Sequence, residues 1–169
     1  LGKTAASTTI TRFGAAAVTG AARDFPADHV VQPAYKTTWG RALAGTGQLD
    51  RARTILLDAL VDFRRFRPDT HTDLAGVRLG LGAVYRMQGQ LRESERILRE
   101  ARAVMLANPR QQSMSAGTAG ELGLTLRAIG NRPEGEALLA ESHTGFKTLL
   151  GDAHPYTRRA LARLNGATN

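Results

Sequence analysis

One stretch decides the fold: LGAVYRMQGQLRESERILREA, residues 81–101. Its first half places a small residue beside a large one, Leu81-Gly82, and runs to Gly89, a residue type that commonly ends a helix at a tight reversal. In its second half, apolar residues recur at the spacing of one helical face. The stretch therefore predicts two helices that are joined by a short turn.

The same pattern occurs three times along the chain. Its large–small pairs are Trp39-Gly40, Leu81-Gly82 and Leu122-Gly123, which are 42 and 41 residues apart. A glycine follows each pair at the same distance, at Gly47, Gly89 and Gly130. Self-similarity at a fixed period of this size is typical of a solenoid, in which each repeat is one supersecondary unit.

Periodicity predicts that the repeated units are helical. Apolar residues recur with i, i+3, i+4 and i+7 spacing, and no window alternates with a period of two, so we expect an all-α chain. The expected architecture has three helix pairs and one flanking helix at each end. Helices are expected over residues 8–23, 50–66, 73–87, 92–106 and 155–165, among others. Thr70 and Thr72 are the expected caps of the helix over 73–87.

The whole chain, residues 1–169, fits this register and is interpreted as one domain. We expect it to be a fragment of a longer protein, because it begins at Leu1 and its first helix lacks a partner. Ile10, Phe13 and Val18 have the character of stacking residues on that helix, where a solenoid end would need a polar cap. Neighbouring repeats, an adjoining domain or self-association through the ends could cover them.

These residues resemble the tetratricopeptide repeat, and the copy at 81–101 matches its pattern best. The resemblance implies a right-handed α-solenoid whose first helices line a concave face. The long period, together with the Gly-Asp-Ala-His-Pro-Tyr-Thr run at 151–157, is similar to the kinesin-light-chain-like subclass. That subclass implies a scaffold or sensor part of a larger bacterial protein, with a protein partner. We expect a cytoplasmic location and, because the sequence contains no common catalytic motif, no enzymatic activity.

Other kinds of site find little support in the sequence. Cysteine is absent, which excludes disulfides, thiolate metal sites and cysteine nucleophiles. His29, His71 and His154 recur at equivalent positions, but packed helices about 8–10 Å apart would keep them from sharing one metal ion. Leu1-Gly2-Lys3-Thr4 lacks the earlier glycine of a phosphate-binding loop. No cofactor and no membrane-spanning segment are expected.

We expect the binding site on the inner face of the first helices, where residues outside the repeat signature remain. The candidate peptide-binding residues are Arg41, Leu79, Gly80, Ala83, Arg86, Gly120, Leu124, Arg127 and Arg163. Arginine pairs well with carboxylates, so we expect an acidic peptide or protein segment as partner. Close helix packing is the alternative explanation for the glycines. Because Arg86 and Arg127 lie outside the signature, reversing both charges is expected to leave stability nearly unchanged.

The charge of the chain leaves one alternative function open. There are 23 basic and 15 acidic residues, which give a net charge of +8. All basic residues except Lys3, Lys36 and Lys147 are arginine, which codon usage in a GC-rich genome could also produce. The alternative to protein binding is therefore a regulatory domain that binds nucleic acid through phosphate contacts.

Overall fold

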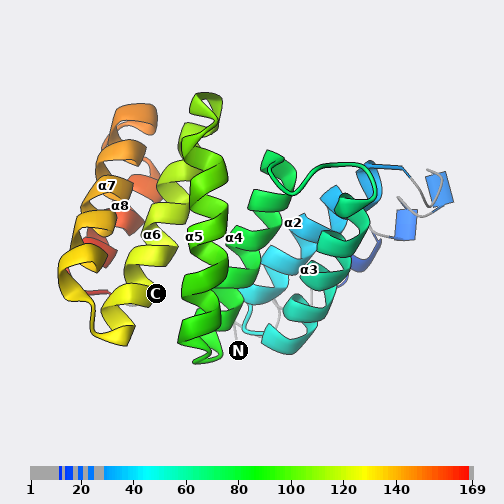
Figure 1. Ribbon diagram of the computed structural model, residues 1–169, viewed down its shortest axis with the longest axis horizontal. Coiled ribbons are helices and arrows are strands. Elements are labelled where there is room, and N and C mark those ends of the chain that lie inside the picture. Colours follow the sequence, from blue (N-terminus) through cyan, green and yellow to red (C-terminus); the bar gives the residue numbers. More distant parts are fainter. Residues whose placement is uncertain (1–11, 13, 17–18, 21–22, 25–28, 168–169) are drawn as a thin grey trace.

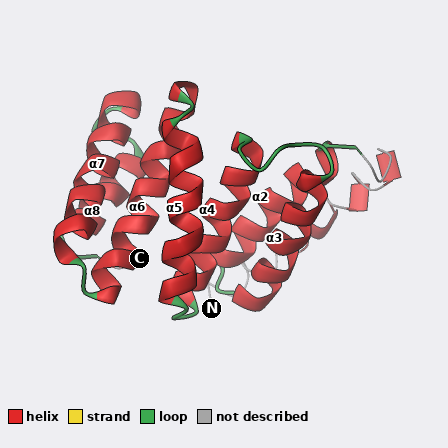
Figure 2. Ribbon diagram, viewed as in Figure 1, coloured by secondary structure: helices red, strands yellow, loops and turns green. Residues whose placement is uncertain are grey.

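A computed structural model describes residues 12, 14–16, 19–20, 23–24 and 29–167. Three helix pairs follow one another along the chain, and a single helix follows them (Figure 1). The helices are α2 (Val31–Gly45), α3 (Leu49–Arg64), α4 (Thr72–Met87), α5 (Leu91–Leu106), α6 (Gln112–Ile129), α7 (Arg132–Leu150) and α8 (Pro155–Leu164), with a short 3₁₀ turn, Pro109–Gln111, before α6. No strand occurs in the part of the chain that the structure describes (Figure 2).

The predicted all-α, right-handed solenoid of helix-turn-helix repeats is confirmed. The expected helices over 50–66, 73–87, 92–106 and 155–165 agree with the observed ones to within two residues at each end. The expected helix over 8–23 lies mostly outside the described residues, as do Ile10, Phe13 and Val18. In Figure 1 the repeats follow one another along the longest axis, from α2 and α3 at one end to α7 and α8 at the other.

The turn inside each helix pair has the same geometry in all three repeats. Gly47, Gly89 and Gly130 have φ values of 82°, 77° and 101°, a left-handed conformation that side chains disfavour. After each glycine, the next backbone N–H donates to a carbonyl five residues earlier, from Gln48 to Leu43, from Gln90 to Tyr85 and from Asn131 to Leu126, at 2.8–3.0 Å. This closure reverses the chain tightly, so the two helices of each pair lie antiparallel.

The repeated small residues lie where the two helices of a pair approach most closely. A Cβ atom built on Gly40 would lie 2.6 Å from Cγ of Leu56, and one on Gly123 would lie 2.9 Å from Cγ of Leu139. Gly82 meets the equivalent Leu98 in the same way. The large residue of each second helix therefore fills the space that the glycine leaves.

The recurring histidines begin first helices. Nδ1 of His29, His71 and His154 accepts a hydrogen bond from the backbone N–H of the residue two positions later, at 3.1–3.2 Å. This satisfies an N–H that has no partner within the helix. The expected caps of α4, Thr70 and Thr72, are therefore wrong, because His71 lies between them and provides the cap.

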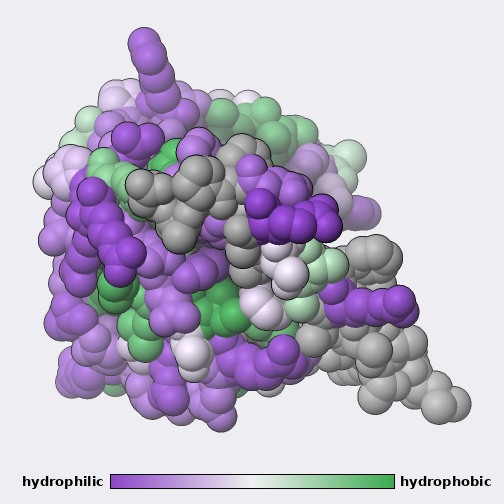
Figure 3. All heavy atoms as spheres, turned by 90° about the vertical axis from the view of Figure 1, so that its right-hand side faces the viewer, coloured by the Kyte–Doolittle hydropathy of each residue, from purple (hydrophilic) through white to green (hydrophobic). Residues whose placement is uncertain are grey.

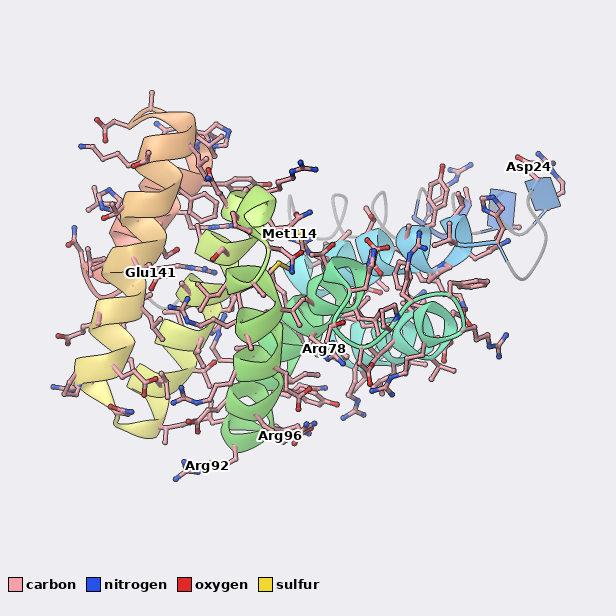
Figure 4. All side chains as sticks on the ribbon, turned by 45° about the horizontal axis from the view of Figure 1, so that its top comes forward. Asp24, Arg78, Arg92, Arg96, Met114 and Glu141 are labelled. Carbon is pink, nitrogen blue, oxygen red and sulfur yellow. The ribbon has the colours of Figure 1, made fainter. Side chains whose placement is uncertain are left out.

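A buried arginine fixes the connection between the first two pairs. Arg78 of α4 is 5% exposed, and it donates to the carbonyl and the carboxylate of Asp69 at 2.8 and 3.0 Å. Its Nε also lies 3.4 Å from Oε2 of Glu100 on α5. Arg78 thus joins the loop after α3 to the next pair, and Figure 4 shows it among the side chains between these elements.

Candidate functional site

The first helices form a continuous inner layer. α2 contacts α4, α4 contacts α6, and α6 contacts α8, in addition to the packing of each against its own second helix. A groove of about 790 Å³ lies along this layer. Its lining comprises Arg41, Ala44, Gly45, Leu49, Leu79, Gly80, Ala83, Arg86, Met87, Gly117, Glu121, Ser142, Phe146, Tyr156, Arg159, Ala160 and Arg163. All four first helices contribute to it.

Most of the residues predicted from the sequence lie together in this groove. Those that line it are Arg41, Leu79, Gly80, Ala83, Arg86 and Arg163. Gly80 also has a packing role, because a Cβ atom there would lie 3.1 Å from Cγ of Arg41. The absent side chain lets the aliphatic part of Arg41 lie across α4.

Three of the predicted residues lie elsewhere. A Cβ atom on Gly120 would lie 2.7 Å from Oγ of Ser142, so this glycine makes room for α7. Leu124 is only 4% exposed and belongs to the core. Arg127 donates to the carbonyl oxygens of Arg163 and Ala167, at 2.9 and 3.0 Å. These three residues serve the contacts between helices.

Arg127 holds the end of α8, because its two carbonyl partners belong to the last residues of that helix and those after it. Arg86, at the equivalent position one repeat earlier, also reaches the next first helix, where it meets Glu121. Both arginines therefore join adjacent repeats. Reversing their charges should lower stability, in contrast to the expectation from the sequence.

An ion-pair cluster lies in the groove wall. Oε2 of Glu121 accepts from Nε and Nη2 of Arg86, at 3.2 and 3.1 Å, and Oε1 accepts from Nη2 of Arg163 at 2.8 Å. The exposed fractions of these three side chains are only 12–14%. One carboxylate thus neutralises part of the charge of two arginines that come from different helices.

Two further arginines face the groove without an ion pair among the residues that the structure describes. Arg41 and Arg159 are exposed, and neither has a carboxylate within 4 Å among the residues that the structure describes. Desolvation and repulsion from Arg163 and Arg41 lower the pKa of Arg159, although attraction to Glu121 and Tyr156 opposes this shift. The groove therefore has an excess of positive charge that an anionic group would relieve.

Aromatic and apolar side chains complete the lining. Phe146 of α7 is buried and lies 5.6 Å, centroid to centroid, from the ring of Tyr156. Tyr156 is 47% exposed, and the guanidinium carbon of Arg159 lies 5.1 Å from the centre of its ring. Together with Leu79 and Ala83, these groups give the groove an apolar surface beside its arginines.

Sequence reasoning missed Glu121, Phe146 and Tyr156 as groove residues. Glu121 is the only acidic residue of α6 and stands directly before the large–small pair, on a helix whose other residues are mainly small or apolar. The sequence could therefore have pointed to Glu121, because an acidic residue is unusual on such a helix. Tyr156 and Phe146 come together only through the packing of α8 on α7, which the repeat register alone does not specify.

Neither a metal cluster nor a membrane-spanning helix is found among the described residues. No group of three or more His, Cys, Asp and Glu side chains among them could hold a metal ion. None of the helices within the described part of the chain is long and apolar enough to cross a bilayer.

Comparison with known proteins agrees with the helix-turn-helix repeats. Two family models described as tetratricopeptide repeat match residues 33–107 and 115–156. A comparison with curated protein sequences finds no significant match.

Solved structures show the same fold at low sequence identity. BtubC (BKLC) from P. vanneervenii matches 97% of this chain over 66% of its own, with a TM-score of 0.67 and 16% identity. A Podosopora anserina protein assigned as a kinesin light chain, with nearly identical TPR-like repeats, matches 94% of this chain over 77% of its own, with a TM-score of 0.67 and 20% identity. A single-residue variant of it has a TM-score of 0.68 over 76% of its length. These similarities establish the fold.

Proposed function

Because the chain belongs to the tetratricopeptide repeat family and shares the fold of kinesin-light-chain-like members, we propose that it binds an acidic segment of a partner protein in its concave groove. Tetratricopeptide repeats are protein-interaction scaffolds, and the fold is generally a non-catalytic module. The finer features of the proposal, which are the groove and the acidic partner, rest on the arginines of the inner layer.

One observation carries the proposal: Arg41 and Arg159 project into the groove without a carboxylate partner among the described residues. A carboxylate between them would form charge-assisted hydrogen bonds and reduce the repulsion among the groove arginines. The neighbouring surface of Ala83 and Met87 would contact apolar side chains of the same segment. Charge would thus provide specificity, and apolar burial would add affinity.

The remaining features predicted from the sequence stay predictions. They are the place of the chain as a scaffold or sensor part of a larger cytoplasmic bacterial protein, an adjoining domain, and self-association through the solenoid ends. No observation on the groove favours nucleic acid over an acidic peptide, so duplex DNA is best included as a competing ligand in the test.

Filling the groove tests the proposal. Ala83 lines the groove on α4, whereas Ala103 is exposed on the second helix α5, so Ala83→Trp and Ala103→Trp add the same side chain to opposite layers. The probe is a pool of short fluorescent peptides rich in Asp and Glu. We expect Ala83→Trp to weaken binding by about tenfold or more, because the indole occupies the site, and Ala103→Trp to have little effect.

Two outcomes would count against the proposal. One is equal binding by both variants at unchanged melting temperatures. The other is preferential binding of unrelated duplex DNA, with a steep loss of affinity as salt is raised, which would favour the nucleic-acid alternative.

A further inference from the structure

The charged groups of the groove do not balance one another. Its lining includes four arginines, Arg41, Arg86, Arg159 and Arg163, and one acidic residue, Glu121. The four guanidinium groups come from three first helices, α2, α4 and α8. They therefore converge on one region although they are far apart in the sequence.

Glu121 organises this cluster without neutralising it. Both of its carboxylate oxygens are engaged, one by Arg86 and the other by Arg163. The two guanidinium groups are thereby fixed in place, which lowers the entropic cost of binding a further anion. An excess of three positive charges remains at the cluster.

The chemistry of the ligand follows from this excess. A single carboxylate would bring one negative charge and two acceptor oxygens, and Glu121 already supplies such a group from within. A phosphate monoester brings about −1.5 to −2 charges near pH 7 and three strong acceptor oxygens on one centre. Guanidinium groups match phosphate oxygens well, because they can offer two parallel N–H donors.

The surroundings of the cluster suit a phosphate that is attached to a polypeptide. Beside the arginines lie Leu79, Ala83 and Gly117, which form an apolar floor without a second charged cluster. A Cβ atom on Gly117 would have no neighbour nearer than 3.7 Å, so the floor is open at this point. A flanking peptide backbone could lie there, whereas a free anion would make no use of this surface.

We propose that the arginine cluster of the groove binds a phosphorylated side chain of the partner segment. This inference rests on the proposed function, because it assigns the charged part of the same groove. Arg41 and Arg159 would contact the phosphate directly, and Glu121 is a positioning residue that holds Arg86 and Arg163.

Three peptide pools test the inference. They have the same randomised acidic flanks and differ only in the central residue, which is phosphoserine, glutamate or serine. Their affinities for the full chain are measured by fluorescence anisotropy at physiological ionic strength. We expect the phosphoserine pool to bind about tenfold more tightly than the glutamate pool, and the serine pool to bind most weakly.

Matched variants test whether the groove arginines cause the preference for phosphoserine. Arg158 and Arg159 are exposed neighbours on α8, but only Arg159 lines the groove. Arg159→Gln and Arg41→Gln should each remove most of the preference for phosphoserine over glutamate, whereas Arg158→Gln should preserve it. Unchanged melting temperatures would exclude loss of the fold as the cause.

The possible results separate this inference from the proposed function. Equal binding of the phosphoserine and glutamate pools, both blocked by Ala83→Trp, would overturn the inference and leave acidic-segment binding intact. Binding of neither pool would overturn both. If inorganic phosphate alone competed at the same concentration as the phosphoserine pool, the site would be an anion site rather than one for a phosphorylated segment. A preference that Arg158→Gln reduces as much as Arg159→Gln would assign the effect to general surface charge.

Discussion

At the scale of single residues, Glu121 connects the stability of the solenoid to the charge of its groove. Its carboxylate lies between Arg86 and Arg163, and all three side chains are largely buried. If this charge is removed, two guanidinium groups are left close together in a partly desolvated wall. Breaking a buried ion pair by removing one partner is usually far more costly than losing an exposed pair.

We therefore predict that Glu121→Gln lowers the free energy of unfolding by about 3 kcal/mol. The control is Glu136→Gln on α7, because Glu136 is exposed and has no ion pair among the described residues. Urea denaturation of both variants at neutral pH measures the difference. Equal stability of the two variants would show that Glu121 does not hold the arginines as described.

At two glycines of α6, substitution by alanine is expected to change the stability of the protein in opposite directions. A Cβ atom on Gly123 would lie 2.8 Å from the carbonyl oxygen of Gly135 and 3.1 Å from the backbone nitrogen of Leu139, neither of which can move away alone. Gly123→Ala should therefore destabilise the protein by about 1–3 kcal/mol.

Gly117, on the same helix, has ordinary contact distances of 3.7 and 3.9 Å at the added methyl group. Gly117→Ala should therefore stabilise the protein by about 1 kcal/mol through helix propensity. Chemical denaturation of the two variants measures whether each substitution raises or lowers the free energy of unfolding. Similar effects of both substitutions would contradict the packing described for the repeat signature.

The sequence predicts some of these residue-level roles and not others. The register identifies Gly40, Gly82 and Gly123 as points of close packing, because a small residue recurs beside a large one. It does not identify the partners of Arg86 and Arg127, because those partners are 35 to 40 residues away in the chain. Whether an arginine reaches such a distant partner depends on how successive first helices pack against each other. A local sequence pattern does not encode this packing.

At the scale of elements, ion pairs connect two of the second helices, α5 and α7. Arg99 of α5 donates to both carboxylate oxygens of Glu134 on α7, at 2.6 and 2.9 Å, and Arg102 pairs in the same way with Glu141 at 2.8 Å. Arg92 and Arg96 lie near the start of α5, where Arg96 pairs with acidic residues of its own helix (Figure 4). The packing of α5 beside α7 is thus supported by two exposed or partly exposed ion pairs, each of which contributes little by itself.

These pairs predict a dependence of stability on pH. The hydrogen bond from Arg99 lowers the pKa of Glu134 below its ordinary value of 4.5, against the opposing effect of burial. Because the folded pKa is the lower one, this stabilisation is present above the unfolded pKa and is lost as the pH falls through the folded value.

Glu134→Gln should therefore reduce the loss of stability between neutral pH and pH values below 4.5, by less than about 1 kcal/mol since the pair is partly exposed. Urea titrations of the variant and the unmodified protein across this range make the comparison. If the variant lost as much stability in acid as the unmodified protein, the pair would not contribute.

The bounds of α3, α4, α5 and α8 were predictable to within two residues, because glycine turns and apolar periodicity mark them. The caps were less predictable. His71 provides the cap of α4, although Thr70 and Thr72 are more usual capping residues, because only His71 stands at the N-cap position.

At the scale of the whole molecule, the arginines differ in how far carboxylates neutralise them. The net charge is +8, yet all four arginines of α5 pair with glutamates on α5 or α7. Figure 3 shows hydrophilic side chains over most of the described surface at one end of the solenoid, with smaller apolar areas between them. In the groove, four arginines face one glutamate, and this local excess is the basis of the proposed function.

The measurement that tests this account most directly compares two double charge reversals. Arg41→Glu with Arg159→Glu changes the groove, and Arg92→Glu with Arg158→Glu changes exposed positions outside it, so both variants have the same net charge. The dissociation constant of the acidic peptide pool is measured for each at physiological ionic strength. We predict that the groove variant loses affinity by about tenfold or more, while the other variant stays within about threefold of the unmodified protein. Equal losses in both variants, at unchanged melting temperatures, would contradict the assignment of the groove.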